Sequence, residues 1–539
     1  MASLTVNLTV NLATAWLASV APGAALRSDS RQITPGDVFF SYADPDPLTD
    51  PAIRRGYIAA AIVQGAAAIL FDPQGMDWSD AWLPPHLALP ELKQCAGPIA
   101  HAFYGMPDSA MYSIGITGTN GKTSCAVWLG QALAHLAAGA AGRSGAAGHS
   151  GAVAPVVAVI GTLGVGCFGA QGAVRFDVTG YTTPDAVLLA HTLAQLRAGS
   201  ANAVAIEVSS IGLDQGRLNG MHFDVALMTN LSRDHLDYHA DMASYEAAKS
   251  MLFDWPGLQS AVLNLDDAMG LRLLARLKSQ SPDGLALYGY TLQDGAARPD
   301  LDGVVMLRAS ALRSRPAGLE FHLACGSVTA QVKTRLVGRF NISNALGVMA
   351  VLLAKGVPLR AAIDAIEALT PAPGRMQQVG GSDGPMVVID YAHTPDALEK
   401  TLLALRPMAQ ERNGKLWCVF GCGGERDRGK RAAMGALSQL ADHVLVTSDN
   451  PRFEEPLHII EQIVAGMDLQ HPGCTLQTVP DRAAAILAAI KHAARSDVIL
   501  LAGKGHEPSM EIKGKKLPFS DADHAALALA ARVTMKKAP

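Results

Sequence analysis

The chain has 539 residues, more than one hydrophobic core usually holds, so two to four domains are expected. Apolar residues make up 49% and aromatic residues 5% of the chain, and the net charge is −4 with no basic block. This composition is typical of a large enzyme with closely packed α/β layers, and it argues against a nucleic-acid partner.

Two apolar segments near the N-terminus are predicted to be core elements. Residues 1–20 carry no basic residue, and the first one is Arg27, which argues against a secretory signal. Residues 57–71 are too few to span a bilayer. The seven cysteines are scattered, odd in number and without zinc spacing, which is typical of reduced, mostly buried residues in a cytoplasmic protein.

Residues 1–112 are predicted to form a small α/β domain. A strand over 37–40, a helix over 59–63 and a strand over 67–71 follow one another between turns. Gly105-Met106-Pro107 marks the linker into a central domain.

A phosphate-binding loop opens this central domain, predicted over 113–370. Strand 113–117 and helix 126–136 enclose Gly118-Thr119-Asn120-Gly121-Lys122-Thr123-Ser124. The glycines let backbone N–H groups approach an anion, Lys122 neutralises phosphate charge, and Thr123 or Ser124 offers Mg²⁺ a hydroxyl. We therefore expect ATP here. Ile116 stands where the usual spacing has glycine, so Gly118 makes the turn; an ordinary glycine-rich turn is the alternative.

Residues 137–154 are almost wholly Ala, Gly and Ser, which predicts a mobile loop insertion. After a strand over 156–160, Thr182-Thr183-Pro184-Asp185 opens a helix, and its threonines are expected to cap it. Strand 203–208 then carries Glu207 at its end, where folds with a phosphate loop place a magnesium ligand. A carboxylate facing water at a strand edge is the alternative.

The next strand, 225–228, ends in the segment 229–239, which contains Asp234, His235, Asp237 and His239. Ionisable groups at the carboxyl end of such a strand predict a ligand and metal site. Lys249 follows on a helix, and its spacing alone favours a solvated side chain. Alternation over 303–334 predicts antiparallel strands, and a helix begins within 338–344.

Residues 371–539 are predicted to form a Rossmann-like, doubly wound domain. Strands 386–390, 416–420, 443–447 and 497–501 alternate with helices. A polar segment follows each strand, namely 390–396, 421–427, 448–452 and 503–507. Stabilising turns explain the glycines of these segments but not the repeated Arg, His and carboxylate residues, so a binding face for a charged substrate is predicted.

Together these segments resemble the Mur ligase family, the ATP-dependent amide-forming enzymes of peptidoglycan precursor synthesis and so of cell-wall growth and division. The resemblance spans residues 29–507 and rests on 118–123, 207–210, 230–239, Pro-Gly-Arg-Met at 373–376 and Asp-Tyr-Ala-His-Thr-Pro at 390–395. Asp449-Asn450-Pro451-Arg452 resembles the signature of members that add meso-diaminopimelate. Two positions differ from the pattern of the family. Ile211 stands where relatives often carry histidine, and Asp44-Pro45-Asp46-Pro47 stands where they usually have a glycine-containing run.

The resemblance implies an α/β fold of three domains and a role for each matching residue. ATP would be held by Gly118, Thr119, Asn120, Gly121, Lys122, Thr123 and Ser124, with Asn264 and Asn341 nearby. Catalysis would use Lys122, Lys249, Glu207 and His235, and two Mg²⁺ ions would be held by Thr123, Glu207, His235 and Lys249 as its carbamate. UDP-N-acetylmuramoyl-L-alanyl-D-glutamate would be held by Ser28, Ser30, Thr182, Thr183, Ser209, Gln215 and Arg217. Diaminopimelate would be held by Arg426, Asp449, Asn450, Pro451, Arg452, Gly503 and Glu507.

Other activities remain as alternatives: a lysine-adding Mur ligase, a ligase similar to folylpolyglutamate synthase, and a non-catalytic ATP-binding switch. Asp449 to Arg452 and the segment 182–184 argue against the folate-type ligase, and the C-terminal binding face argues against the switch. The expected partners are the two small-molecule substrates, with no membrane or nucleic acid, and the expected state is a cytoplasmic monomer.

Overall fold

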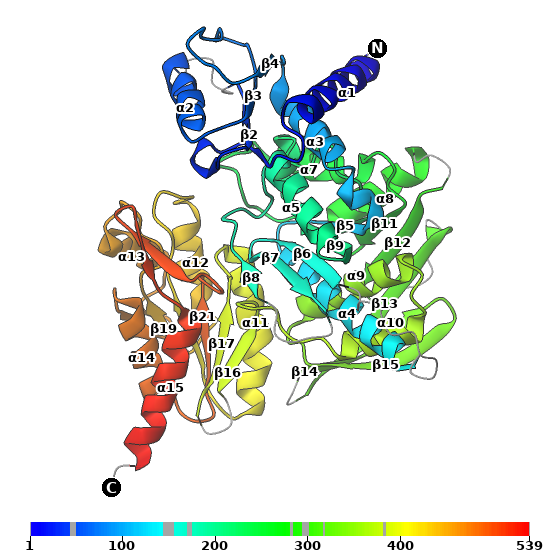
Figure 1. Ribbon diagram of the computed structural model, residues 1–539. Coiled ribbons are helices and arrows are strands. Elements are labelled where there is room, and N and C mark those ends of the chain that lie inside the picture. Colours follow the sequence, from blue (N-terminus) through cyan, green and yellow to red (C-terminus); the bar gives the residue numbers. More distant parts are fainter. Residues whose placement is uncertain are drawn as a thin grey trace.

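Three sheets, one after another along the chain, organise the molecule (Figure 1). The computed structural model describes residues 2–43, 50–143, 156–169, 175–280, 284–293, 301–315, 318–380 and 384–537. The predicted loop at 44–47 and most of the predicted insertion at 137–154 lie outside these residues.

The N-terminal sheet is parallel, in the order β1-β2-β3-β4. Its strands are β1 (Leu26–Arg27), β2 (Val38–Ser41), β3 (Ala68–Phe71) and β4 (His86–Ala88), and its helices are α1 (Ala2–Val20), α2 (Pro51–Val63) and α3 (Leu92–Phe103). Alternate residues of β2 face opposite sides: Phe39 packs with α2, and Phe40 packs with α1 and α3. Val187 and Ala190 of the central region join the second of these cores, so the N-terminal sheet is docked by apolar burial.

The central sheet has the order β15-β14-β13-β12-β11-β10-β5-β9-β6-β7-β8 within the described residues. Its strands are β5 (Tyr112–Thr117), β6 (Val156–Gly161), β7 (Gly164–Phe168), β8 (Phe176–Asp177), β9 (Ala201–Glu207), β10 (Val225–Met228), β11 (Ser260–Asn264), β12 (Ala286–Thr291), β13 (Val304–Arg315), β14 (Gly318–Cys325) and β15 (Val328–Thr334). The strands from β13 to β6 are parallel, and the strands beyond them at both edges are antiparallel. The antiparallel region predicted over 303–334 therefore extends this sheet.

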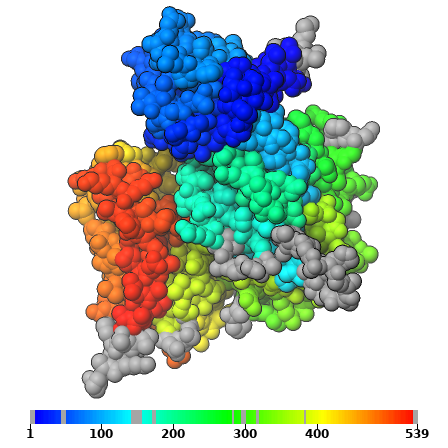
Figure 2. Space-filling model, viewed as in Figure 1, coloured from blue at the N-terminus to red at the C-terminus, as the bar shows by residue number. Residues whose placement is uncertain are grey.

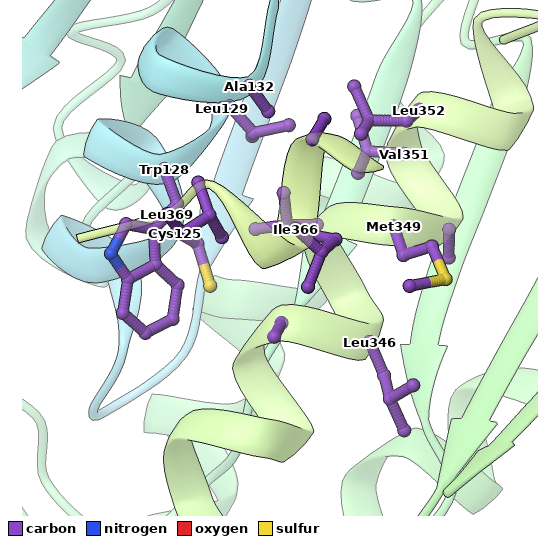
Figure 3. Close-up of a cluster of buried hydrophobic side chains, with 14 of the residues drawn as sticks. Cys125, Trp128, Leu129, Ala132, Leu346, Met349, Val351, Leu352, Ile366 and Leu369 are labelled. Carbon is purple, nitrogen blue, oxygen red and sulfur yellow. The ribbon is translucent and has the colours of Figure 1, made fainter. Parts of the chain in front are cut away.

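Helices cover both faces of the central sheet, as expected when its strands are apolar runs. They are α4 (Lys122–Arg143), α5 (Ala186–Ala198), α6 (Ser210–Asp214), α7 (Met242–Ser250), α8 (Ala268–Gln280), α9 (Arg339–Ala354) and α10 (Leu359–Glu367). Figure 3 shows Trp128 and Leu129 of α4 on one side of this apolar cluster and Leu346 and Met349 of α9 on the other. Ile366 of α10 lies between the two groups. This apolar layer fixes α4, and with it the loop before α4, against the sheet.

The C-terminal sheet has the order β16-β17-β21-β18-β19-β20, parallel except for β16. Its strands are β16 (Gln377–Gly380), β17 (Met386–Asp390), β18 (Leu416–Phe420), β19 (His443–Val446), β20 (Thr475–Thr478) and β21 (Val498–Ala502), followed by the hairpin β22 (Ser509–Ile512) and β23 (Lys515–Pro518). Helices α11 (Pro395–Glu411), α12 (Lys430–Ser438) and α13 (Pro456–Val464) pack on one face, and α14 (Arg482–His492) and α15 (Asp521–Lys537) on the other. The predicted doubly wound arrangement is confirmed.

The predicted α/β class with mainly parallel sheets is thus confirmed, while the domain boundaries near 112 and 370 stay predictions. One predicted loop is partly wrong: residues 137–143 continue helix α4, because alanine has the highest helix propensity. The predicted threonine cap is also wrong. Asp185 caps α5, since its carboxylate accepts the Val187 N–H, and Thr183 instead donates to the Glu207 carbonyl. No helix in the described part of the chain is long and apolar enough to cross a membrane.

Candidate active site

A cavity of about 810 Å³ lies between the central and C-terminal sheets. Its walls come from the phosphate loop, the ends of β9 and β10, and the loops after β17, β18, β19 and β21. These are carboxyl ends of parallel strands, where open α/β sheets bind ligands. Figure 2 shows the C-terminal body, coloured from yellow-green to red, lying against the central body.

The phosphate loop is fixed by its glycines and by strand β10. Gly118 has a φ of +141°, and a Cβ atom there would lie 1.9 Å from Thr229 Oγ1. Gly121 has a φ of +88°, and a Cβ atom there would lie 2.6 Å from Asn344 Oδ1. The Thr119 N–H donates to the Asn230 carbonyl at 2.8 Å. Glycine is therefore required at both positions, because the loop backbone lies directly against Thr229 and Asn344. The approach of the loop to a phosphate stays a prediction.

Lys122 opens helix α4 and lies over the loop. Its Nζ donates to the carbonyls of Gly118 at 2.6 Å and Thr119 at 3.0 Å. Burial lowers the pKa of this ammonium group, opposed by the nearby Glu207 carboxylate. An anion in the loop would restore the charge that burial disfavours.

Glu207 is 2% exposed, so the predicted alternative of a water-facing strand-edge carboxylate is wrong. Its Oε2 accepts hydrogen bonds from the Thr123 hydroxyl at 3.0 Å and the Thr162 hydroxyl at 3.1 Å, and its Oε1 accepts the Thr162 N–H at 2.9 Å. Arg375 Nη2 donates to Thr123 Oγ1 at 3.0 Å. The Thr123 hydroxyl of the phosphate loop thus contacts the Glu207 carboxylate of the central sheet and the Arg375 guanidinium of the C-terminal region.

Lys249 is 1% exposed, so the solvated side chain favoured by its spacing is wrong. Its Nζ donates to the Gly118 carbonyl at 3.2 Å and lies 4.3 Å from the centre of the Tyr245 ring. Burial, with a contribution from nearby Lys122, lowers the pKa of Lys249 well below its usual value. A lowered pKa favours the neutral amine, which is the nucleophilic form of lysine.

His235 also lines the cavity, with a left-handed backbone (φ +54°) and its Nε2 atom 3.6 Å from Asp234 Oδ2. Among the described residues, no group of three or more His, Cys, Asp or Glu side chains is arranged to hold a metal ion. Mg²⁺ in nucleotide sites needs only one or two carboxylates besides phosphate oxygens. Thr123 and Glu207, which supply hard oxygen donors side by side, fit that requirement.

The residues predicted for the muramoyl dipeptide form a connected group at the cavity wall. Thr183 Oγ1 lies 2.9 Å from Ser209 Oγ, and Thr182 Oγ1 lies 3.1 Å from Thr162 Oγ1. Arg217 donates to the Thr183 carbonyl at 2.9 Å. Gln215, which accepts from Arg217, lies just outside the cavity lining.

Ser28 and Ser30 lie apart from this cavity, on the N-terminal sheet's side of the molecule. The Ser28 hydroxyl donates to Asp185 Oδ1 at 2.7 Å, and Ser30 is buried in a short 3₁₀ turn (Ser30–Gln32). The structure therefore does not bring them together with the phosphate loop.

The residues predicted for the amino acid gather after β19 and β21. Asn450 Nδ2 donates to Glu507 Oε2 at 2.9 Å, and Lys504 Nζ donates to the same oxygen at 2.8 Å. Arg452 donates to the Gly424 carbonyl at 2.6 Å. Asp449, Arg426 and Gly503 also line the cavity, whereas Pro451 does not.

The two asparagines predicted near the nucleotide are buried but line the cavity. Asn264 Nδ2 donates to the Thr229 carbonyl at 2.6 Å, and Asn341 Nδ2 donates to the Val337 carbonyl at 2.8 Å. Both side chains brace the strand and helix ends around the cavity.

Thr162, Arg375 and Lys504 are among the cavity or near-cavity residues that were not predicted. Thr162 follows strand β6, so the rule of strand carboxyl ends was able to find it. Arg375 and Lys504 lie inside segments quoted for the resemblance or next to predicted residues. The Thr123 partner of Arg375 and the Asn450 partner of Lys504 come from distant parts of the chain, whereas Glu507, the other partner of Lys504, is local.

Comparison with known proteins gives a consistent result over nearly the whole chain. Residues 116–352 match the Mur ligase middle domain, and residues 374–505 match the Mur ligase, glutamate ligase domain. A UDP-N-acetylmuramoyl-L-alanyl-D-glutamate--2,6-diaminopimelate ligase of Janthinobacterium sp. (strain Marseille) is 57% identical over 96% of both chains. The ligase of the same name from Ralstonia nicotianae is 48% identical over 96% of this chain and 95% of its own.

A solved structure of a ligase of that name resembles this chain with a TM-score of 0.62 and 30% identity. The match covers 96% of this chain and 99% of the chain in that structure.

Proposed function

Because the chain belongs to the Mur ligase family, we propose that it joins meso-2,6-diaminopimelate to UDP-N-acetylmuramoyl-L-alanyl-D-glutamate at the expense of ATP. One observation carries this proposal: a single cavity is lined both by the phosphate loop and by Asp449, Asn450 and Arg452. A nucleotide phosphate and an amino-acid amine are thereby brought to one place. The reaction is an amide ligation that yields ADP and phosphate, in the cytoplasm and by a monomer.

The reaction has two steps. The γ-carboxylate of the D-glutamyl residue attacks the γ-phosphorus of ATP, which forms an acyl phosphate and releases ADP. The amine of diaminopimelate then attacks the acyl carbon, phosphate leaves, and the amine loses a proton. Neither step needs a nucleophile from the protein, so positioning and charge stabilisation supply the catalysis.

In the first step, the loop from Gly118 to Ser124 binds the phosphates and Lys122 neutralises the charge on the transferred group. Thr123 and Glu207 would hold Mg²⁺, with His235 beside them, and the ion would stabilise the charge on the phosphoryl oxygens. Asn264 and Asn341, which line the cavity, would lie near the nucleotide.

Lys249 is proposed to act as a carbamate. Burial lowers its pKa, which favours the neutral amine that reacts with CO₂. The carbamate would turn a buried cation beside Gly118 into an anion with two oxygen donors, suited to a second Mg²⁺ ion.

In the second step, the guanidinium groups of Arg426 and Arg452 are proposed to bind carboxylates of diaminopimelate. Asp449 and Glu507 would receive its ammonium group, with Asn450, Pro451 and Gly503 shaping the same loops. Thr182, Thr183, Ser209, Gln215 and Arg217 would hold the muramoyl dipeptide, and Ser28 and Ser30 would lie toward its uridine end.

The test is phosphate release with Mg-ATP and UDP-N-acetylmuramoyl-L-alanyl-D-glutamate, with meso-diaminopimelate or L-lysine as the amine. Release with diaminopimelate and formation of the tripeptide product would support the proposal. Release with lysine alone would contradict the assigned amine but keep the ligase. Release with neither would favour a folate-type ligase or an ATP-binding switch.

A further inference from the structure

Two loops carry the arginines proposed to bind the amino acid, and they touch one another directly. The first loop, residues 421–429, joins β18 to α12, and the second loop, residues 447–455, joins β19 to α13. The Gly424 N–H donates to the Asn450 carbonyl at 2.9 Å. A Cβ atom on Gly424 would lie 2.0 Å from the Pro451 carbonyl oxygen, so the two backbones leave no room for a side chain.

Each loop contains a residue with a strained backbone at its arginine or directly before it. Glu425, which precedes Arg426, has a φ of +52°, and Arg452 itself has a φ of +52°. Non-glycine residues persist in this left-handed region only where surrounding contacts hold them there. Neighbouring residues must therefore hold Glu425 and Arg452 in these conformations. The Arg452 backbone exchanges hydrogen bonds with Glu511 and Lys513 of the hairpin β22–β23.

A second set of contacts comes from an ion pair outside the cavity lining, Arg431 of α12 with Glu454 of the second loop. Arg431 is fully buried, and its Nη1 and Nη2 atoms lie 2.9 and 3.0 Å from the two carboxylate oxygens of Glu454. Nη2 also donates to the Gly423 carbonyl at 3.0 Å. Nη1 also donates to Gln462 Oε1, on α13, at 2.8 Å. One guanidinium thus ties both loops to both following helices.

Glu454 completes the connection to the strained residue. Its Oε1 atom accepts the Glu425 N–H at 2.6 Å. Hydrogen bonds from Arg431 and from this N–H lower the pKa of Glu454 to about 2, so the pair stays charged at neutral pH. The planar fork of arginine matches both carboxylate oxygens, and lysine cannot reproduce that geometry.

We propose that Arg431 and Glu454 are positioning residues for the amine substrate: their ion pair sets the spacing of Arg426 and Arg452, and thereby the choice of amino acid. This inference rests on the proposed function. Neither residue lines the cavity, so both act through the loops. Loosening the pair releases the Glu425 N–H from Glu454 and lets the first loop shift against the second, which changes the spacing of the two guanidinium groups that receive the carboxylates.

The test is steady-state kinetics of Arg431→Lys and Glu454→Gln, with each of the three substrates varied in turn. We expect the KM for diaminopimelate to rise about tenfold or more, the range of a lost charged hydrogen bond, and the KM for ATP to stay within about twofold. The kcat/KM ratio of diaminopimelate to L-lysine should fall by a similar factor. The double variant should lose little beyond either single variant, because the two residues act as one unit.

The matched control is Arg406→Lys. Arg406 pairs with Asp442 at 2.6 Å in the same part of the chain, but Asp442 precedes β19 at the end of the strand away from the cavity. This variant should lower the Tm and leave every KM unchanged. A merely structural role for Arg431 would give the same pattern, and unchanged KM values for diaminopimelate would overturn the proposal.

Glu454→Gln is nearly isosteric, so it decides the question if Arg431→Lys fails to fold. The unmodified chain separates the two levels of inference. If it ligates diaminopimelate and the variants behave like the control, only the positioning role is wrong. If it releases no phosphate with diaminopimelate, the proposed function is wrong and this inference falls with it.

Discussion

At the scale of single residues, burial decides the chemistry of the charged groups around the phosphate loop. Lys249 and Glu207 are both almost fully buried, yet their environments differ. Glu207 accepts three hydrogen bonds, which stabilise its negative charge. Lys249 has one carbonyl partner and a nearby like charge, Lys122, so its cationic form is disfavoured. Perturbed groups of this kind inside a cleft are candidates for function.

Lys249→Ala is expected to leave almost no ligase activity, because the proposed carbamate and its oxygen donors are lost. Added short carboxylates should restore part of the activity by occupying the same space. The matched control is Lys355→Ala, since Lys355 also lies over a tyrosine ring, Tyr112 at 3.8 Å, but outside the cavity lining. Full activity of Lys249→Ala in the phosphate-release assay would contradict the assigned role.

Arg452→Ala should raise the KM for diaminopimelate by about 10- to 100-fold, the cost of losing a charged hydrogen bond, and leave the KM for ATP nearly unchanged. The reason is that Arg452 lies in the loop after β19, on the opposite sheet from the phosphate loop. Initial rates with each substrate varied in turn measure both constants. Equal effects on both would show that Arg452 does not bind the amine.

At the scale of elements, strand carboxyl ends and the loops after them build much of the cavity, and residues of α7, α9 and α11 add to its lining. The phosphate loop follows β5, Glu207 ends β9, and the segment from Thr229 follows β10. Because β9, β5 and β10 are neighbours in one parallel sheet, these three segments meet without any long connection. Hydrogen bonds from Thr119 and Thr229 then lock the first loop to the third.

Gly118→Ala is expected to weaken ATP binding at least about tenfold and to destabilise the fold by about 1–3 kcal/mol, because its Cβ would clash with Thr229 and its φ is unfavourable. Nucleotide titration and urea unfolding measure the two effects. Gly105→Ala is the control, since Gly105 also has a positive φ but open space around it. Normal ATP affinity in Gly118→Ala would contradict the proposed nucleotide site.

At the scale of the whole molecule, the three sheets are joined in two different ways. The N-terminal sheet shares an apolar core with α5 of the central region. The C-terminal body meets the phosphate loop through polar contacts, such as Asn120 Nδ2 to Asp396 Oδ2 at 3.2 Å and Arg375 to Thr123 at 3.0 Å. Its apolar core takes in only Val337 and Phe340, at and just before the start of α9, from the described part of the central region. Polar contacts of this kind exchange readily with water, so the C-terminal body is the one expected to move.

Binding of nucleotide with the muramoyl dipeptide should therefore make the molecule more compact. Small-angle scattering with and without the ligands measures the radius of gyration. Asp396→Ala, which removes one contact across the seam, should reduce the compaction without changing the ligand-free Tm by much. An unchanged radius of gyration with all ligands bound would rule out closure.

Global stability should fall in mild acid because of two histidines beside the cavity. Burial, with nearby Lys430 and Arg375 respectively, lowers the pKa values of His393 and His506 from 6.5 to about 4. Between pH 6.5 and 4 the unfolded chain binds more protons than the folded one. The contribution of the two neutral histidines to the free energy of unfolding is therefore fully present above pH 6.5. It is lost as the pH falls toward 4, by up to about 1.4 kcal/mol per pH unit for each histidine.

Urea unfolding at half-unit steps from pH 7.5 to 4.5 measures this loss of free energy. His393→Gln should flatten the pH dependence, because one titrating group is removed. His458→Gln is the control, since His458 is an exposed residue of α13. A free energy of unfolding that does not change between pH 6.5 and 4.5 would show that both histidines titrate normally.

The sequence by itself determined the α/β class, the phosphate loop and most cavity residues, because these features are local. Period-two and helical patterns, the glycines at 118 and 121 and the polar residues after each strand all lie within short segments. Local composition misled where two local rules competed. At 137–143, for example, the Ala-rich segment continues a helix instead of starting a loop.

The tertiary structure alone decided burial and pairing between distant segments. Lys249 is buried because α7 packs behind the phosphate loop, 131 residues away in sequence, and no pattern on its own helix records that. The Thr183 hydroxyl turns to Glu207 because β9 ends beside it, which leaves Asp185 to cap α5. Arg431 meets Glu454 because two loops from different strands converge. The sequence shows which polar and charged residues follow each strand. Only the packing of elements that are distant in sequence fixes the hydrogen-bond partners and the solvent exposure of these residues.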